Sequence, residues 1–102
     1  MEEIMNKEQI LSYLKNHKQY LHDTFGLNKI ALFGSYARNE NKDSSDIDIL
    51  FEVDTNKKFS MFQYLKLNQY LETNLQSKVD LVREATLKDS IKPYVQKDLI
   101  YV

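Results

Sequence analysis

The sequence contains no cysteine and only one proline and two glycines among its 102 residues. Without cysteine, disulfides and thiolate metal sites are excluded. Its two histidines, His17 and His22, are too few for a histidine-rich zinc site, and both fall in a predicted helix as ordinary surface or boundary residues. Any metal bound by this chain is therefore expected to have oxygen ligands, which favours magnesium or manganese.

The chain also lacks an excess of charge of either sign. Lysine and arginine number 14 and aspartate and glutamate 15, for a formal net charge of −1. No basic stripe of the kind that binds nucleic-acid phosphates is present, so a large nucleic-acid substrate is not expected. Neither a signal peptide nor a membrane-spanning stretch is found, which predicts a cytoplasmic protein with no membrane partner.

Length and a hydrophobic content of 42% predict one α/β domain spanning residues 1–102. The hydrophobic pattern predicts, in order, a helix over 3–24, a strand over 29–33, a short helix over 35–40, a loop over 39–45, a strand over 46–53, a turn over 54–58, a helix over 60–76, a strand over 79–82 and a helix beginning near Pro93. This order predicts a small mixed sheet of three or more strands, with helices on one face and an active site on the other.

Two apolar segments carry specific expectations. On the predicted helix over 60–76, a stripe broadened by Met61 and Leu65 is expected to pack in the core: Tyr64, Leu67, Leu71 and Leu75. The last four residues, 99–102, are apolar. They either close the core or meet a partner.

A Gly34-Ser35 pair ends the first predicted strand. Gly34 tolerates backbone angles that other residues avoid and lets a phosphate approach the main chain. Ser35 offers a hydroxyl and an N–H group as the expected cap of the short helix that follows. A Gly-Ser pair is also a common turn, and on its own it is a weak indication of phosphate binding.

Two aspartates, Asp46 and Asp48, open the next predicted strand. Side chains alternate along a strand, so these two carboxylates share a face, roughly 7 Å apart at about 3.3 Å per residue. Like charges this close repel when partly desolvated, and a divalent cation between them would remove the repulsion. The same Asp-x-Asp pattern is also compatible with a cap at the surface. A phosphate-binding turn beside an aspartate pair is how a metal-bound nucleotide would be held.

Gly-Ser, ten residues and then Asp-x-Asp resembles the signature of the DNA polymerase β-like nucleotidyltransferase superfamily. The runs Leu32–Arg38 and Ser45–Leu50 resemble its minimal nucleotidyltransferase (MNT) branch. The run Lys78–Val82 is similar to the family's later strand, which carries a third carboxylate, here Asp80. The resemblance covers nearly the whole chain and implies the polymerase β-like core fold.

The resemblance implies that Asp46, Asp48 and Asp80 are catalytic and bind two Mg²⁺ ions, with Mn²⁺ as an alternative. Asp80 would complete the ligand set and accept a proton from the attacking hydroxyl. Asp80 alone is also compatible with an edge-strand residue that discourages aggregation.

Nucleotide binding is implied for three residues, Gly34, Ser35 and Arg38. The first two would bind the β- and γ-phosphates of ATP. Arg38 would reach the triphosphate or orient an aspartate, although a solvated surface cation is an equally good interpretation of this residue.

The MNT resemblance implies an antitoxin that moves AMP from ATP to a tyrosine hydroxyl of a HEPN-type toxin, in a hetero-oligomer with that toxin. An alternative is an antitoxin that neutralises its toxin by binding and occlusion, without catalysis. A further alternative is a small-molecule nucleotidyltransferase that modifies an antibiotic, although such enzymes usually carry an acceptor domain for which this chain has little room.

Overall fold

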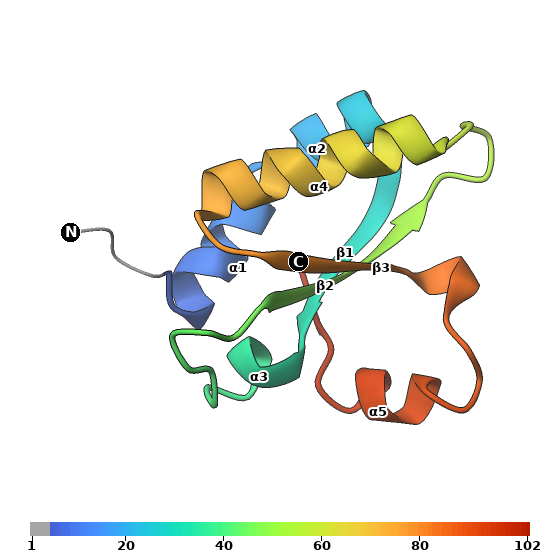
Figure 1. The fold of residues 1–102 in the computed structure, drawn as a ribbon. Coiled ribbons are helices and arrows are strands. Elements are labelled where there is room, and N and C mark those ends of the chain that lie inside the picture. Colours follow the sequence, from blue (N-terminus) through green and yellow to red (C-terminus); the bar gives the residue numbers. More distant parts are fainter. Residues whose placement is uncertain (1–4) are drawn as a thin grey trace.

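A four-stranded mixed sheet forms the centre of the fold in a computed structural model that describes residues 5–102 (Figure 1). In the order β3-β2-β1-β4, β1 pairs antiparallel with β2 and β4, and β2 pairs parallel with β3. The strands are β1 Leu27–Phe33, β2 Ile47–Val53, β3 Val79–Arg83 and β4 Ile100–Tyr101. The predicted fold class is confirmed, and the parallel strands β2 and β3 begin at the same end of the sheet.

Helices lie on both faces of this sheet. The helices among residues 5–102 are α1 Lys7–Asn16, α2 Lys18–Phe25, α3 Gly34–Ala37, α4 Met61–Leu75, the 3-10 helix η1 Glu84–Thr86 and α5 Lys92–Gln96. In α5, Val95 packs with Ala31 and Leu50 in a cluster separate from the main core. The expectation that all helices share one face is therefore wrong for α5, because alternate residues of β1 and β2 are apolar on that side too. Within the same range, no helix has the length and apolar character needed to cross a membrane.

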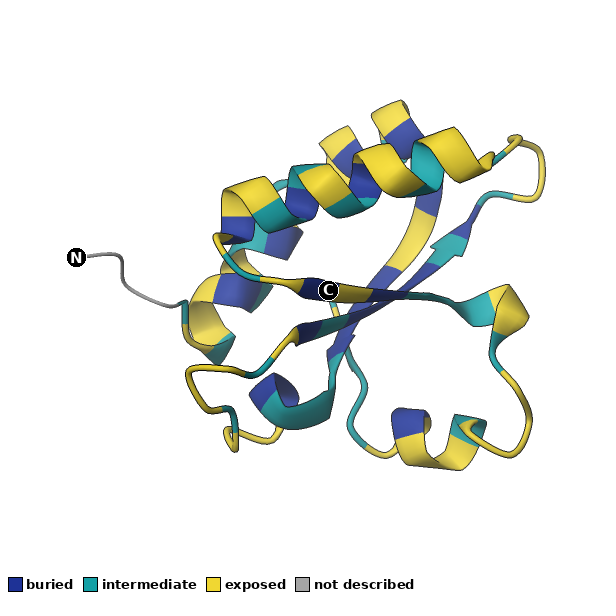
Figure 2. Cartoon of the chain, in the orientation of Figure 1, coloured by how far each residue is buried: buried dark blue, intermediate teal, exposed yellow. Residues whose placement is uncertain are grey.

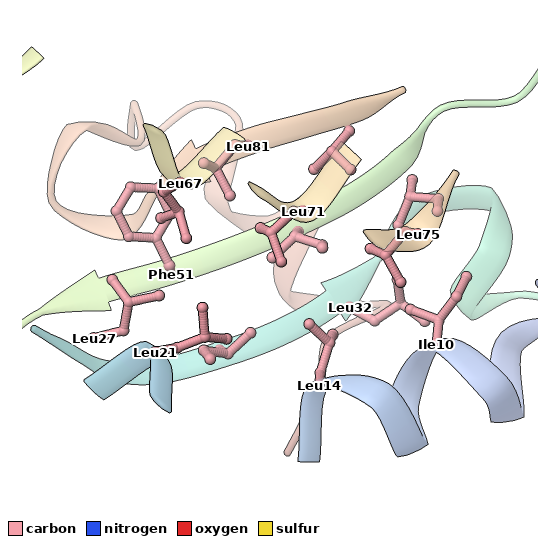
Figure 3. Packing of buried hydrophobic residues seen from close by; sticks show 14 of the residues in the cluster. Ile10, Leu14, Leu21, Leu27, Leu32, Phe51, Leu67, Leu71, Leu75 and Leu81 are labelled. Atoms are coloured by element: carbon pink, nitrogen blue, oxygen red, sulfur yellow. The ribbon is translucent and has the colours of Figure 1, made fainter. Parts of the chain in front are cut away.

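The main core lies between the sheet and the helices α1, α2 and α4. Leu14, Leu21 and Leu71, one from each helix, are at most 1% exposed. They pack with the strand residues Leu32 and Phe51 (Figure 3). The sides of these helices that face the sheet are buried, and the outer side of α4 is largely exposed (Figure 2). Removal of apolar surface from water, worth about 25 cal/mol per Å², is the main term that stabilises this arrangement.

The helix predicted over 3–24 is two helices. Its first two residues lie outside the described part of the chain, and α1 begins only after Asn6. The side chains of Asn6 and Gln9 each accept the other's backbone N–H at 2.9 Å, which forms a capping box. His17 ends α1 and precedes α2, so the prediction of one continuous helix is wrong. The predicted stop at Gly26 is confirmed, because its φ of 77° ends α2 in the left-handed conformation.

The predicted apolar stripe of α4 is confirmed in part. Its buried members are Leu67, Leu71 and Leu75, and Tyr64 packs against them. Met61 is 71% exposed and Leu65 is 57% exposed, so the expectation that they broaden the core is wrong. At about 100° per residue, these two positions fall on a different flank of the helix from the buried leucines.

The end of the chain joins the sheet. Ile100 and Tyr101 form β4, and the N–H of Val102 donates to Ile30 O at 3.1 Å. Ile100 and Val102 pack against the main core, while Leu99 packs against the cluster on the other face. Of the two outcomes considered for this segment, closure of the core is the one that the structure shows.

Candidate active site

Asp48 and Asp80 lie side by side on neighbouring strands. Each is the second residue of its strand, β2 or β3, and the parallel register pairs them directly. Residues paired in this way project to the same face, and adjacent strands are about 4.8 Å apart. Asp48 is half-buried and Asp80 is exposed. The structure therefore brings two of the three predicted carboxylates together at one end of the sheet.

Asp46 is exposed and directly precedes β2, so this strand begins one residue later than predicted. The next residue, Ile47, donates its N–H to Lys78 O at 2.8 Å, which brings the segment to the start of β3. Within residues 5–102, no three His, Asp or Glu side chains are placed as a ready group of metal ligands. The structure pairs Asp48 with Asp80 and leaves Asp46 at the rim of the site.

The environment of Asp48 favours its neutral form. The pKa of Asp48 is raised to about 6, first by burial, then by the charge and hydrogen bonding of Asp80 and the charge of Asp46, against an opposing effect of Arg38. Two adjacent carboxylates resist ionising together because their charges repel. A cation near Asp48 would therefore favour its ionised form.

A close backbone approach joins the turn after β1 to Asp48. Phe33 pairs with Asp48 across the β1–β2 ladder, and Gly34 follows with a φ of 76°, a conformation that glycine adopts without steric cost. A Cβ atom on Gly34 would collide with the Asp48 carboxylate and lie 2.8 Å from its Cγ. The Gly-Ser turn and the acidic strand therefore meet in space, and the contact leaves room for no side chain at residue 34.

The helix after this turn is shorter than the predicted range 35–40, and Ser35 is not its cap. It spans Gly34–Ala37, and the extended Phe33 occupies the cap position without a side-chain hydrogen bond. Ser35 is therefore inside α3. Tyr36 is fully buried and belongs to the main core, so core packing anchors the turn instead of a serine cap.

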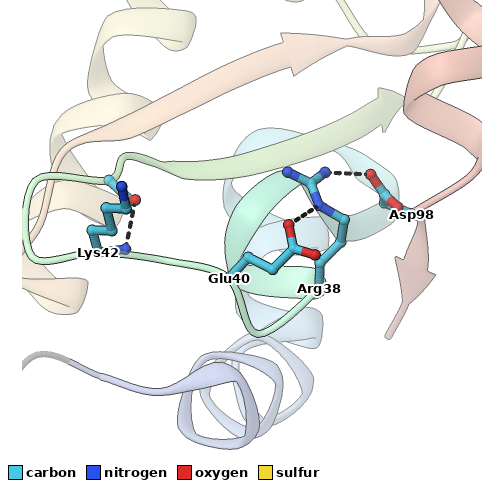
Figure 4. Close-up of polar contacts among 5 residues, drawn as sticks. Arg38, Glu40, Lys42 and Asp98 are labelled. Atoms are coloured by element: carbon cyan, nitrogen blue, oxygen red, sulfur yellow. Dashed lines mark hydrogen bonds and ion pairs between the residues drawn. The ribbon is translucent and has the colours of Figure 1, made fainter.

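Arg38 directly follows α3 and is paired with two carboxylates. Its Nη1 donates to Asp98 Oδ2 at 2.6 Å and its Nε donates to Glu40 Oε2 at 3.1 Å (Figure 4). The side chain of Asp98 is only 11% exposed and comes from the segment between α5 and β4. Phosphate binding by Arg38 stays a prediction. The aspartate that it contacts is Asp98, which is outside the predicted site.

Two cavities at the ends of β2 and β3 differ in their relation to this site. A groove of about 410 Å³ opens beside Asp46, between the loop before β2 and the turn before β3. That loop is closed by a hydrogen bond from Lys42 N–H to Ser45 Oγ at 2.8 Å (Figure 4). A larger cavity of about 660 Å³ lies at the far ends of the two strands and includes Glu52 and Arg83. The larger cavity contains no predicted site residue, whereas the smaller groove includes Asp46, so the candidate active site lies at the end of the strands where the smaller groove opens.

Sequence reasoning missed several residues at this end of the molecule. Asp98 is 60 positions from Arg38, and no local pattern links them. Three polar side chains of α4 bond the backbone of β3: Tyr64, Asn68 and Glu72. Their spacing of four residues beside an apolar stripe places them on one helix flank, a signal that the sequence does contain.

The residues at this site fit a divalent cation. The side-by-side carboxylates of Asp48 and Asp80 supply oxygen donors, the chemistry that Mg²⁺ and Mn²⁺ prefer. The pKa of Asp48 is raised by burial first and then by repulsion from Asp80, and a bound cation would relieve that repulsion. The missing side chain at Gly34 keeps the backbone next to these donors open.

Comparison with known sequences gives one matching family and several relatives. The family model described as a nucleotidyltransferase domain matches residues 14–102. Protein adenylyltransferase MntA of Thermococcus cleftensis is 40% identical over 99 residues, which cover 97% of this chain and 98% of that protein. A Methanocaldococcus jannaschii protein provisionally named a protein adenylyltransferase is 44% identical over 95 residues, which cover 92% of this chain and 95% of that protein.

Solved structures with a similar fold include proteins bound to toxins. A structure described provisionally as a minimal nucleotidyltransferase has a TM-score of 0.77 at 26% identity, covering 94% of this chain and 95% of that one. A chain of a toxin–antitoxin complex with AMP-PNP has a TM-score of 0.68 at 26% identity, with 95% and 72% covered. A chain of the complex between tri-AMPylated Shewanella oneidensis HEPN toxin and MNT antitoxin has a TM-score of 0.59 at 25% identity, with 94% and 67% covered.

Proposed function

The chain belongs to the nucleotidyltransferase domain family, and from that premise we propose that it transfers AMP from ATP to a tyrosine hydroxyl of a HEPN-type toxin and so acts as its antitoxin. The observation that carries this proposal is the pairing of Asp48 with Asp80 beside the Gly34 turn. The relatives support the same reaction, since one that this chain matches over nearly its full length is named a protein adenylyltransferase. The complexes with AMP-PNP and with an AMPylated HEPN toxin support ATP as the donor and a HEPN protein as the partner.

In this proposal Asp46, Asp48 and Asp80 hold the divalent cations, two Mg²⁺ ions or alternatively Mn²⁺. Such cations neutralise the charge that develops on the entering and leaving oxygens and lower the pKa of the attacking hydroxyl. Asp80, as the exposed member of the pair, accepts the proton of that hydroxyl when it attacks the α-phosphate. The half-buried Asp48 lies between Asp80, which faces the attacking hydroxyl, and the Gly34 turn, which binds the phosphates. Asp48 therefore sets the spacing between these two parts of the site.

The phosphates of ATP are assigned to the turn. Gly34 and Ser35 bind the β- and γ-phosphates, because the backbone at residue 34 carries no side chain that would keep a phosphate away. Arg38 lies one residue beyond α3, its guanidinium is held by Asp98 and Glu40, and its charge acts on Asp48. Its positive charge assists binding of the leaving pyrophosphate.

AMP transfer is tested with the purified chain, ATP, Mg²⁺ and the product of the neighbouring reading frame, which under the proposal is a HEPN-type protein. We expect the partner to gain AMP on a tyrosine and to lose its toxic activity, because the carboxylates activate that hydroxyl for attack on ATP. Mass spectrometry of the intact partner and of its peptides gives the number and position of the added groups. A small-molecule enzyme would instead modify an antibiotic in the absence of any partner.

The matched control for this reaction is the Asp46→Asn, Asp48→Asn double variant. Under the proposal it binds the partner and leaves the toxin active and unmodified. If the double variant neutralises the toxin as well as the natural chain does, neutralisation occurs by occlusion and the catalytic role in the antitoxin is wrong.

A further inference from the structure

The helix α4 makes three hydrogen bonds to the backbone of β3. Tyr64 Oη donates to Leu81 O at 2.7 Å, Asn68 Nδ2 donates to Val79 O at 3.1 Å, and Glu72 Oε2 accepts the N–H of Val79 at 2.9 Å. We call these three side chains the α4 row. The two strand residues that they bond, Val79 and Leu81, flank Asp80, one of the proposed catalytic carboxylates.

The α4 row forms hydrogen bonds with the outward-facing backbone groups of an edge strand, β3. β3 ends the sheet, and Lys78 O faces inward, because it accepts the N–H of Ile47 at the start of β2. Backbone groups of successive strand residues alternate between the two edges. Those of Asp80 therefore also face β2, and those of Val79 and Leu81 face outward. The backbone of Asp80 is thus paired with β2, while the backbone groups of its two neighbours bond side chains of α4 on the opposite edge of the strand.

The spacing of the row matches the strand. Four residues of an α-helix advance by about 6 Å, and two residues of a strand advance by about 6.6 Å. Side chains at 64 and 68 therefore reach the carbonyls of alternate residues of β3, Leu81 and Val79, and the side chain at 72 reaches the N–H of Val79. The helix that carries them is fixed in turn by the buried side chains of Leu67 and Leu71, so the row is a rigid support.

We propose that the α4 row positions the third carboxylate: by bonding the residues on either side of Asp80, it fixes that side chain beside Asp48 for cation binding. The inference rests on the proposed function. A row that served only to block strand addition at the sheet edge would stabilise β3 without changing how cations bind. Cation affinity and the split between kcat and KM therefore distinguish the two roles.

The test uses the variants Asn68→Ala and Glu72→Ala in the full chain. We expect each to weaken Mn²⁺ binding, measured by calorimetry with a non-hydrolysable ATP analogue present, by about tenfold or more, the usual effect of removing a support behind a metal ligand. The kcat of AMP transfer should fall by a similar factor. The KM for ATP should stay within about twofold, because the phosphate-binding turn is on another element.

Three further variants serve as controls. Glu72→Gln keeps an oxygen that can accept the N–H of Val79, and it should restore Mn²⁺ affinity to near the natural value. Gln69→Ala changes an exposed residue of the same helix and should leave both affinity and kcat unchanged. In an Asp80→Asn background, Asn68→Ala should cause no further loss of Mn²⁺ affinity, because the row acts through Asp80.

The proposal is overturned if Asn68→Ala and Glu72→Ala bind Mn²⁺ and transfer AMP as Gln69→Ala does, or if Asn68→Ala causes its full loss of affinity in the Asp80→Asn background. Thermal melts establish that each variant is folded, and where Asn68→Ala is not, the Glu72→Ala and Glu72→Gln pair decides. If the natural chain binds Mn²⁺ through Asp80 but transfers no AMP, the proposed function fails and the affinities still test the row.

Discussion

Replacing Asp48 with asparagine is expected to lower AMP transfer by about a thousandfold and, at the same time, to raise Tm at neutral pH. The rate falls because a neutral amide cannot hold cations next to the reacting phosphate. Loss of roughly 4 kcal/mol of transition-state stabilisation, within the several kcal/mol that a bound metal supplies, corresponds to about three powers of ten. Transfer is measured with the partner protein and labelled ATP at saturating Mg²⁺.

The gain in stability follows from the sign of the pKa shift. The pKa of Asp48 is about 6 in the folded chain, above its ordinary value of 3.8, so folding favours the protonated form. The contribution of this group to stability is fully present below pH 3.8 and is lost as the pH rises through 6. Above pH 6 the natural chain carries a half-buried carboxylate, repelled by Asp80, that the asparagine variant lacks. The Tm advantage of the variant should therefore be largest at pH 7.5 and vanish near pH 4.

Thermal melts from pH 4 to pH 8 without divalent cations provide the measurement. Asp89→Asn is the control, since Asp89 is 96% exposed and forms only a surface ion pair with Lys92, which contributes little to stability. It should change neither Tm nor transfer. An Asp48→Asn variant that is less stable than the natural chain at pH 7.5, or that has the same advantage at every pH, would contradict this account of the charge.

Replacing Gly34 with alanine is expected to lower AMP transfer by about a hundredfold. The added Cβ meets the Asp48 carboxylate, so either that side chain moves away from Asp80 or the turn moves away from Asp48. A misplacement of about 1 Å in a reacting constellation is enough for an effect of this size. The measurement is the rate of transfer together with the affinity for ATP, which should also fall.

The second glycine of the chain gives a matched control. Gly26 has a φ of +77°, almost the same as the +76° of Gly34, so alanine suffers the same left-handed strain of about 1–2 kcal/mol at either position. At Gly26 the added Cβ meets the flexible side chain of Lys57 instead of a carboxylate. Gly26→Ala should lose comparable stability and retain transfer. Equal loss of transfer in both variants would mean that strain, and not the contact with Asp48, is responsible.

Local periodicity predicted most of the fold. Strands β1 to β3 are found within a residue or two of their predicted ends, because an apolar run ended by glycine or by a charged residue leaves little choice of boundary. The short strand β4 was not predicted. Periodicity did not predict the break at His17, which no glycine or proline marks. It also could not tell that Met61 and Leu65 face outward, since their burial depends on how α4 is rotated over the sheet.

In the candidate site, too, the sequence predicted the local features, and the contacts between distant segments depended on the fold. The Gly34 turn and the aspartates of β2 are near in sequence, and their meeting across the β1–β2 ladder follows from one hairpin-like connection. The apolar pattern predicted the strand over 79–82, and the resemblance assigned the third carboxylate of the site to Asp80 on it. The pairing of Arg38 with Asp98 joins segments that are 60 positions apart in the sequence, and only the completed fold brings them together.

The central claim is that the carboxylates of Asp46, Asp48 and Asp80 bind divalent cations next to a turn that binds the triphosphate. It is tested most directly by a crystal structure with Mn²⁺ and a non-hydrolysable ATP analogue, in which anomalous scattering locates the metal. We predict Mn²⁺ in contact with all three carboxylates and the β- and γ-phosphates at Gly34 and Ser35. Mn²⁺ that contacts none of these carboxylates, or a triphosphate bound in the cavity near Glu52 and Arg83, would contradict the account.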